Sequence, residues 1–133
     1  MDGIRIGQVS SIDYDNGMAK ILYNDRDGAV TKPLPVFSLN GEYKMPKVGQ
    51  YVLVVHLSNG SEAGCVLGTY WNVSNNPVAK GADIFRKELG AEPGEAFLQY
   101  NDGTLQINAN DIVFTSVAGS ISLASIINKL GQS

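Results

Sequence analysis

The sequence predicts an all-β protein, with a small five-stranded Greek-key barrel first and a shorter β-rich segment at the end. Short runs of alternating or β-branched residues recur along the chain, and turn signals such as Asp-Asn-Gly and Asn-Gly separate them. Glycine accounts for 15 of the 133 residues, which suits a chain with many tight turns. An apolar content of 44% with only 17% charged residues excludes a disordered chain.

The first three expected strands lie before residue 37. Ile4–Val9 alternates with period two, as a half-buried strand does, and the pattern continues loosely through Ile12 to Tyr14. Met18–Tyr23 is expected to form the second strand after an Asp-Asn-Gly turn. A second reversal of Asn, Asp and Gly residues leads into Ala29–Val36. Because Pro33 and Pro35 cannot donate backbone hydrogen bonds, we expect them at a sheet edge or at the exit of this strand.

The next two strands are expected to form a hairpin. Tyr51–Leu57 is a short apolar run that predicts a buried strand, and about Glu62–Tyr70 predicts its partner. Asn59-Gly60 between them is the dipeptide that most readily forms a type I′ turn. Residues 37–47 carry an Asn-Gly pair and a proline, and they predict a loop.

Four residues of the second hairpin strand are candidate structural determinants. Glycine weakens a strand unless a bulge, a corner or a close backbone approach requires it, so Gly64 and Gly68 indicate strong curvature. Tyr70 and Trp71, at the end of the strand, are expected to anchor the barrel or an interface rather than to stack on a ligand.

The hairpin resembles a known family at these positions: Pro46, Val48, Gly49, Val52, Val54, Asn59, Gly60, Gly64, Val66, Leu67, Gly68, Tyr70 and Trp71. The pattern is similar to the last hairpin of the oligonucleotide/oligosaccharide-binding (OB) barrel in phage baseplate assembly protein V and related central spikes of contractile injection systems. Gln50 departs from it, since the family often has an acidic residue there. The resemblance covers about the first 71 residues, and more loosely the tail from Gly94. It implies an OB barrel over residues 1–75.

Residues 76–93 are expected to be a linker. Ser-Asn-Asn-Pro breaks the strand pattern before it, and Asp83–Leu89 lies between two glycines. That segment predicts about two turns of helix.

Residues 94–133 are expected to be a β tip that is ordered only by association. Phe97–Tyr100 leads into an Asn-Asp-Gly turn, and three short alternating pieces follow before Ser125–Leu130, which predicts a short helical or strand cap. About forty residues cannot bury enough apolar surface alone, and the segment has neither a cysteine pair nor a metal motif. The resemblance implies that three copies intertwine as a β-prism or β-helix. The expected trimer core is Leu105, Ile107, Ile112, Phe114, Ile121 and Leu123.

The net charge limits the kinds of partner that the protein can bind, and the cysteine content indicates the compartment in which it is assembled. The net charge is −3, and no cluster of Lys or Arg could neutralise a run of phosphates, so nucleic-acid binding is disfavoured. Cys65 is the only cysteine, which fits a protein assembled in a reducing cytoplasm. The first residues do not predict a signal peptide, and no stretch of the sequence is long and apolar enough to span a bilayer.

The residues that could carry chemistry favour structural roles. Asp25 and Asp27 lack the remaining ligands of a calcium loop and predict a turn. His56 is the only histidine, so it cannot form a histidine pair for a metal, and Cys65 has no basic neighbour in sequence that would activate it. The linker glutamates, Glu88, Glu92 and Glu95, are expected to be solvated charges rather than a glycosidase pair. We therefore expect no enzyme activity, no catalytic or metal-binding residue and no cofactor.

The resemblance implies a structural function. The expected role is the homotrimeric central spike of a contractile phage tail or a phage-like particle such as a bacteriocin, assembled in the bacterial cytoplasm. The expected partners are the tail hub and baseplate, in some particles a separate tip protein, and transiently the target envelope. The alternative is an OB-fold module that binds a glycan or single-stranded nucleic acid and oligomerises through its tail. That alternative requires a basic or aromatic-rich groove, which the sequence does not predict.

Overall fold

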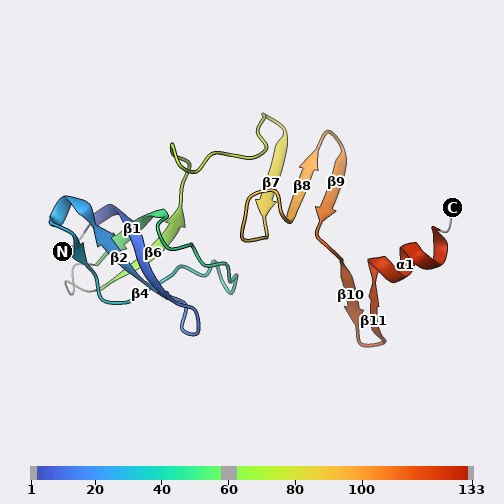
Figure 1. Cartoon of the computed structure of the whole chain (residues 1–133), viewed down its shortest axis with the longest axis horizontal. Helices are drawn as coiled ribbons and strands as arrows, with labels where there is room; N and C mark the ends of the chain where they lie inside the picture. Colours follow the sequence, from blue (N-terminus) through green and yellow to red (C-terminus); the bar gives the residue numbers. More distant parts are fainter. Residues whose placement is uncertain (1–2, 58–62, 132–133) are drawn as a thin grey trace. The chain divides into compact units, whose positions relative to one another are not determined.

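The computed structural model describes residues 3–57 and 63–131, and its described part is mostly antiparallel β-structure (Figure 1). The sequence prediction of an all-β protein is confirmed at that level. The chain divides into two compact units, Met1–Asn76 and Pro77–Ser133. No helix among the described residues is long and apolar enough to cross a membrane.

The first unit is built around one sheet with the strand order β3-β2-β1-β5-β6, in which β4 also pairs with β2. All the strand pairs in it are antiparallel. The strands are β1 Gly3–Asp13, β2 Met18–Tyr23, β3 Ala29–Val30, β4 Leu34–Pro35, β5 Tyr51–His56 and β6 Gly64–Thr69, with a 3-10 turn at Asn24–Arg26. The Asn59-Gly60 turn predicted between β5 and β6 lies outside the described residues.

The expected third strand is present as two short pieces, β3 and β4, separated by Thr31–Pro33. Pro35 lies in β4 opposite Met18, and the following residue Val36 forms a parallel bridge with Val66 of β6. Residues 34–36 therefore join β2 to β6, which the sheet order otherwise separates by β1 and β5.

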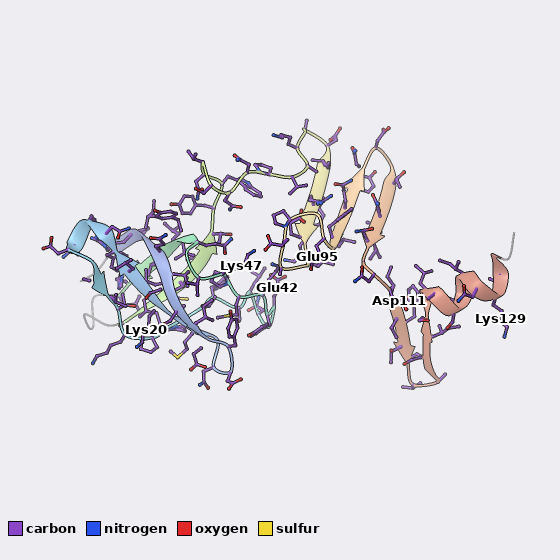
Figure 2. The ribbon with its side chains drawn as sticks, in the orientation of Figure 1. Lys20, Glu42, Lys47, Glu95, Asp111 and Lys129 are labelled. Carbon is purple, nitrogen blue, oxygen red and sulfur yellow. The ribbon has the colours of Figure 1, made fainter. Side chains whose placement is uncertain are left out.

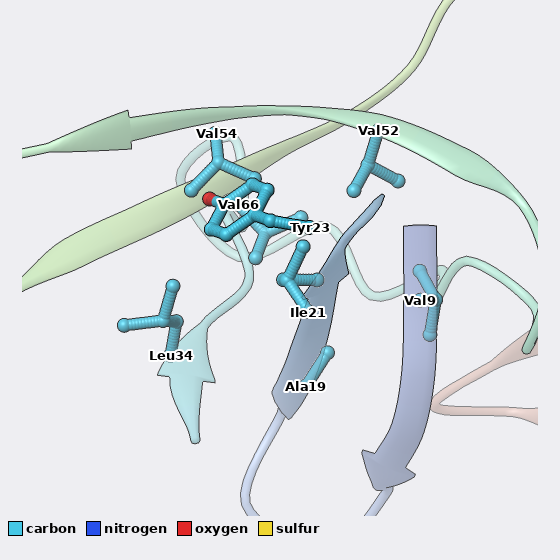
Figure 3. Close-up of a cluster of buried hydrophobic side chains, with 8 residues drawn as sticks. All are labelled: Val9, Ala19, Ile21, Tyr23, Leu34, Val52, Val54 and Val66. Atoms are coloured by element: carbon cyan, nitrogen blue, oxygen red, sulfur yellow. The ribbon is translucent and has the colours of Figure 1, made fainter. Parts of the chain in front are cut away.

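The core of the first unit lies on one face of this curved sheet (Figure 3). Its strands alternate buried and less buried residues, as in β5, where Val52, Val54 and His56 point inward. The buried apolar side chains are Val9, Ala19, Ile21, Tyr23, Leu34, Val52, Val54 and Val66. Since burial of one such large side chain contributes about 1.5–3 kcal/mol, this cluster is the main stabilising feature of the unit.

The two glycines of β6 satisfy different requirements. Gly68 has φ +136° and lies at a register shift of the β5–β6 ladder, so it permits a β-bulge. Gly64 lies outside the left-handed region, but a Cβ there would be 2.6 Å from the backbone oxygen of Val55. Close backbone approach therefore accounts for Gly64, while the bulge accounts for Gly68.

The second unit contains a three-stranded sheet, β7-β8-β9, a two-stranded hairpin, β10-β11, and one helix. Their bounds are β7 Ile84–Glu88, β8 Phe97–Asn101, β9 Thr104–Asn108, β10 Val113–Ser116, β11 Gly119–Ser122 and α1 Leu123–Leu130.

The helix predicted for Asp83–Leu89 is wrong, because Ile84–Glu88 forms strand β7. Each of its five residues pairs with one of β8, from Ile84 opposite Asn101 to Glu88 opposite Phe97. Two isolated helical turns have too few hydrogen bonds to be stable in water, whereas a strand beside β8 pairs its backbone throughout. The predicted linker therefore contains a strand of the sheet.

Candidate assembly interface

The second unit has no buried side chain among its described residues, 77–131. Among the residues that the structure describes, all the fully buried apolar side chains belong to the first unit. An isolated hairpin or a small sheet without a covered apolar face is marginally stable in water. The position of the apolar side chains in the second unit therefore determines which surfaces it can offer for association.

The β7–β9 sheet has one predominantly apolar face. The pairing places Phe85 opposite Tyr100, Tyr100 opposite Leu105, and Leu98 opposite Ile107. Alternation along the strands puts these five residues on the same side of the sheet. Leu105 is 64% exposed, and Leu98 is partly buried. The side chains of Phe85, Tyr100 and Ile107 are each about half exposed. This face is mostly apolar, with Lys87 of β7 beside Leu98, and none of its residues is buried.

The opposite face of the sheet is more polar, and Arg86 links several of its side chains. Arg86 donates hydrogen bonds to the Glu88 carboxylate at 2.6 Å and to the Gln99 side-chain oxygen at 2.9 Å. Its guanidinium carbon lies 3.5 Å from the centre of the Phe97 ring. These contacts use the polar groups of this face within the sheet, so association through the apolar face would not have to break them.

The β10–β11 hairpin also separates apolar from polar residues. Phe114 pairs with Ile121, and the Leu123 backbone N–H donates to the Ile112 oxygen at 2.6 Å, which extends the pairing by one step. Thr115 and Ser120 form the neighbouring pair on the other face, where their hydroxyls lie 2.8 Å apart. An open hollow on the hairpin is lined by both Phe114 and Ile121.

Helix α1 follows the hairpin directly and is fixed at its start by two polar residues. The Ser122 hydroxyl accepts a hydrogen bond from the Ser125 N–H as an N-cap, and Asp111 Oδ1 accepts from the N–H groups of both Ile112 and Ala124. Figure 2 labels Asp111 beside the starts of β10 and α1. The apolar residues of the helix follow helical spacing and share one face: Leu123, Ile126, Ile127 and Leu130. The sequence predicted either a helical or a strand cap at Ser125–Leu130, and the structure shows a helix there.

The six residues expected in the trimer core fall into two groups in the single chain. Ile112, Phe114, Ile121 and Leu123 come together on the hairpin, and Leu105 with Ile107 lies on the apolar face of the β7–β9 sheet. None of the six is buried. Sequence reasoning did not single out Phe85, Leu98 or Tyr100, because their place on that face depends on the β7–β8 register. Tyr70 is half-buried, while Trp71 is 66% exposed at the end of the first unit.

Two of the residues considered for chemistry, His56 and Asp25, belong to one polar cluster of the first unit. The Tyr23 hydroxyl and His56 Nε2 lie 2.6 Å apart and are hydrogen-bonded. The Arg5 guanidinium stacks over the Tyr23 ring and forms an ion pair with Asp25, which is largely exposed. Burial raises the pKa of the Tyr23 phenol above its ordinary value, against the opposite effect of Arg5. Asp25 therefore serves an ion pair rather than a calcium loop.

Nothing in the described residues assembles a metal site, since no group of three or more His, Cys, Asp or Glu side chains converges there. Cys65 lies in β6, half-buried, and burial raises the pKa of its thiol. A thiol of raised pKa carries less thiolate at neutral pH and is a weaker nucleophile. At the end of β7, Glu88 forms an ion pair with Arg86, and its carboxylate also accepts a hydrogen bond from the Gly94 N–H at 2.8 Å.

Replacing Tyr23 with Phe should lower the unfolding free energy by about 1–3 kcal/mol, because His56 Nε2 would lose its partner in a buried environment. Tyr14→Phe is the matched control, since Tyr14 is 59% exposed and its change should have little effect. Chemical denaturation of both variants measures the difference.

Burial of the Tyr23 phenol gives a pH dependence of stability with a known sign. A raised phenol pKa means that the folded state favours the neutral Tyr23. Its contribution is fully present below about pH 10 and is lost as the pH rises toward the raised value. The Tyr23→Phe protein should lose less stability above that pH than the unmodified protein. Equal losses in both would contradict the assigned role of Tyr23.

Comparisons with known proteins do not assign the chain to a family. No protein-family model matches it, and no curated protein matches its sequence. The candidate function therefore depends on the residues and geometry described above, together with the resemblance of the 46–71 hairpin.

Proposed function

We propose that the protein is the structural central spike of a contractile phage tail or a phage-like injection particle, and that it acts as a homotrimer without catalysing a reaction. The observation that carries the proposal is the second unit, which presents apolar faces and has no buried side chain among its described residues. In the trimer, sister copies bury these apolar faces against one another, since each chain carries the same faces.

The first unit acts in this proposal as an OB-type barrel that seats the spike on the tail hub. Segment 34–36 supports this role, because it pairs with β2 and also bridges to β6. The sheet therefore curves far enough for β2 and β6 to contact the same segment. The bulge at Gly68 adds curvature at the same side of the sheet. The resemblance of the β5–β6 hairpin to the spike family supports the same assignment.

The second unit acts as the tip, in which the tails of three copies intertwine as a β-prism or short β-helix. Exposed strand edges are liable to pair with other chains, and closing them among three copies removes that liability. Such a tip would unfold only if several chains separated together. That property suits a part that is driven against a cell envelope, either alone or with a separate tip protein.

Light scattering of the purified chain, before and after deletion of residues 94–133, tests the proposal. We expect three copies for the full chain and one for the shortened chain. An unchanged mass after deletion would show that the first unit holds the assembly. A monomeric full chain that binds glycans or oligonucleotides in a screen would instead favour the alternative binding module.

A further inference from the structure

The first unit carries an exposed apolar surface that its own core does not use. In β1, β5 and β6 the residues that alternate with the buried ones form the opposite side of the sheet, with Ile4 opposite Val55, Ile6 opposite Leu53, and Val55 opposite Cys65. We call this surface the outer face. Gln8, opposite Tyr51, is its polar residue. The other members of the outer face are Ile4, Ile6, Tyr51, Leu53, Val55, Leu57, Cys65 and Leu67.

The outer face has no charged side chain among these residues. Arg5, the one basic residue of β1, faces the other way and contacts Tyr23 and Asp25. A partner recognised by charge, such as a phosphate backbone or an acidic peptide, would find no counter-ion on this surface. The outer face is therefore complementary to a partner whose contacting surface is mainly apolar.

The area of the outer face suits a partner that another contact already holds close to it. The exposed fractions are 69% for Ile4, 54% for Ile6, 39% for Tyr51, 50% for Leu57 and 43% for Leu67. They correspond to roughly 400 Å² of side-chain surface, which is large for a monomer but below the roughly 800 Å² per partner of a stable free-standing interface. Copies joined through their tails meet at millimolar effective concentration, so a contact of this size suffices between them.

We propose that the outer faces of sister copies pack against one another in the assembled protein and form a second interface, separate from the tail. This inference rests on the proposed association of the tails. A surface without charges is compatible with itself, because bringing copies together buries no unpaired charge and creates no like-charge repulsion.

Cys65 supplies the measurement, because it lies on the outer face and is the only thiol in the chain. Labelling of the full chain with an uncharged maleimide reports whether the face is covered. We expect labelling in the assembled protein to be at least about tenfold slower than in a Phe114→Asp chain whose tail association is broken. Rates are compared at one pH, since burial raises the pKa of this thiol.

An Ile6→Lys variant separates the two interfaces. It should leave the mass at three copies, because the tail is intact, and should raise the Cys65 labelling rate toward that of the monomer. Val73→Lys is the matched control: Val73 is 96% exposed in the same unit but lies in the turn between Asn72 and Asn75, outside the sheet, and the Cys65 labelling rate should not change.

Three outcomes would overturn the inference, and they differ in what they say about the tail. A three-copy protein with Cys65 labelled as fast as in the monomer would reject the outer-face contact and leave the proposed function standing. Equal protection in the assembly and in the Phe114→Asp monomer would assign the cover to the chain itself. A monomeric unmodified chain would reject both proposals.

Discussion

Replacing Phe114 with Asp is expected to reduce the mass of the protein in solution from three copies to one. Phe114 pairs with Ile121 on the apolar face of the β10–β11 hairpin, is 53% exposed, and lines the hollow there. In the proposed trimer this side chain is covered by sister copies. A carboxylate at the same position would have to be desolvated three times over without a cation to pair with it, which costs several kcal/mol per copy.

The control for this change is Val117→Asp. Val117 lies in the turn between β10 and β11 and is fully exposed, so the same added charge should remain in water and leave three copies. Light scattering at one protein concentration compares the two variants with the unmodified chain. Three copies in the Phe114→Asp protein would mean that the hairpin face is not part of the interface.

The strands of the first unit could largely be predicted from sequence, because local patterns determine them. Period-two alternation located β1, an Asp-Asn-Gly turn marked the start of β2, and a short apolar run located β5, each to within a few residues. Pro33 lies in the break between β3 and β4. What the sequence could not provide was the pairing between distant strands. The contact of Tyr23 with His56 spans 33 residues and depends on the β1–β2 and β1–β5 registers together.

The same limit explains the error at Ile84–Glu88. Taken alone, the segment has residues that suit a helix as well as a strand, and its flanking glycines fit either. Its state is decided by β8, which begins nine residues after β7 ends and supplies a partner for each residue of β7. The apolar face of that sheet was missed for the same reason, since Phe85 and Tyr100 become neighbours only in the paired register.

Gly7 is a further residue whose importance depends on distant strands, and Gly7→Ala is expected to be the most destabilising single substitution in the first unit. Gly7 is buried in β1 and has no positive φ, so the sequence alone does not mark it. A Cβ there would overlap the Ile21 side chain and lie 2.7 Å from Cε1 of Tyr23. Both neighbours are fully buried, and neither can move into solvent.

The expected loss for Gly7→Ala is about 3 kcal/mol or more, since overpacking a filled core costs about 1–3 kcal/mol and any shift of Tyr23 also weakens its hydrogen bond to His56. For a unit of this size that corresponds to a fall in Tm of at least about 10 °C. Gly90→Ala is the control, because the nearest obstacle there is the flexible Glu95 carboxylate in the second unit. Thermal denaturation followed by circular dichroism compares them, and an unchanged Tm for Gly7→Ala would mean that β1 does not lie this close to Ile21 and Tyr23.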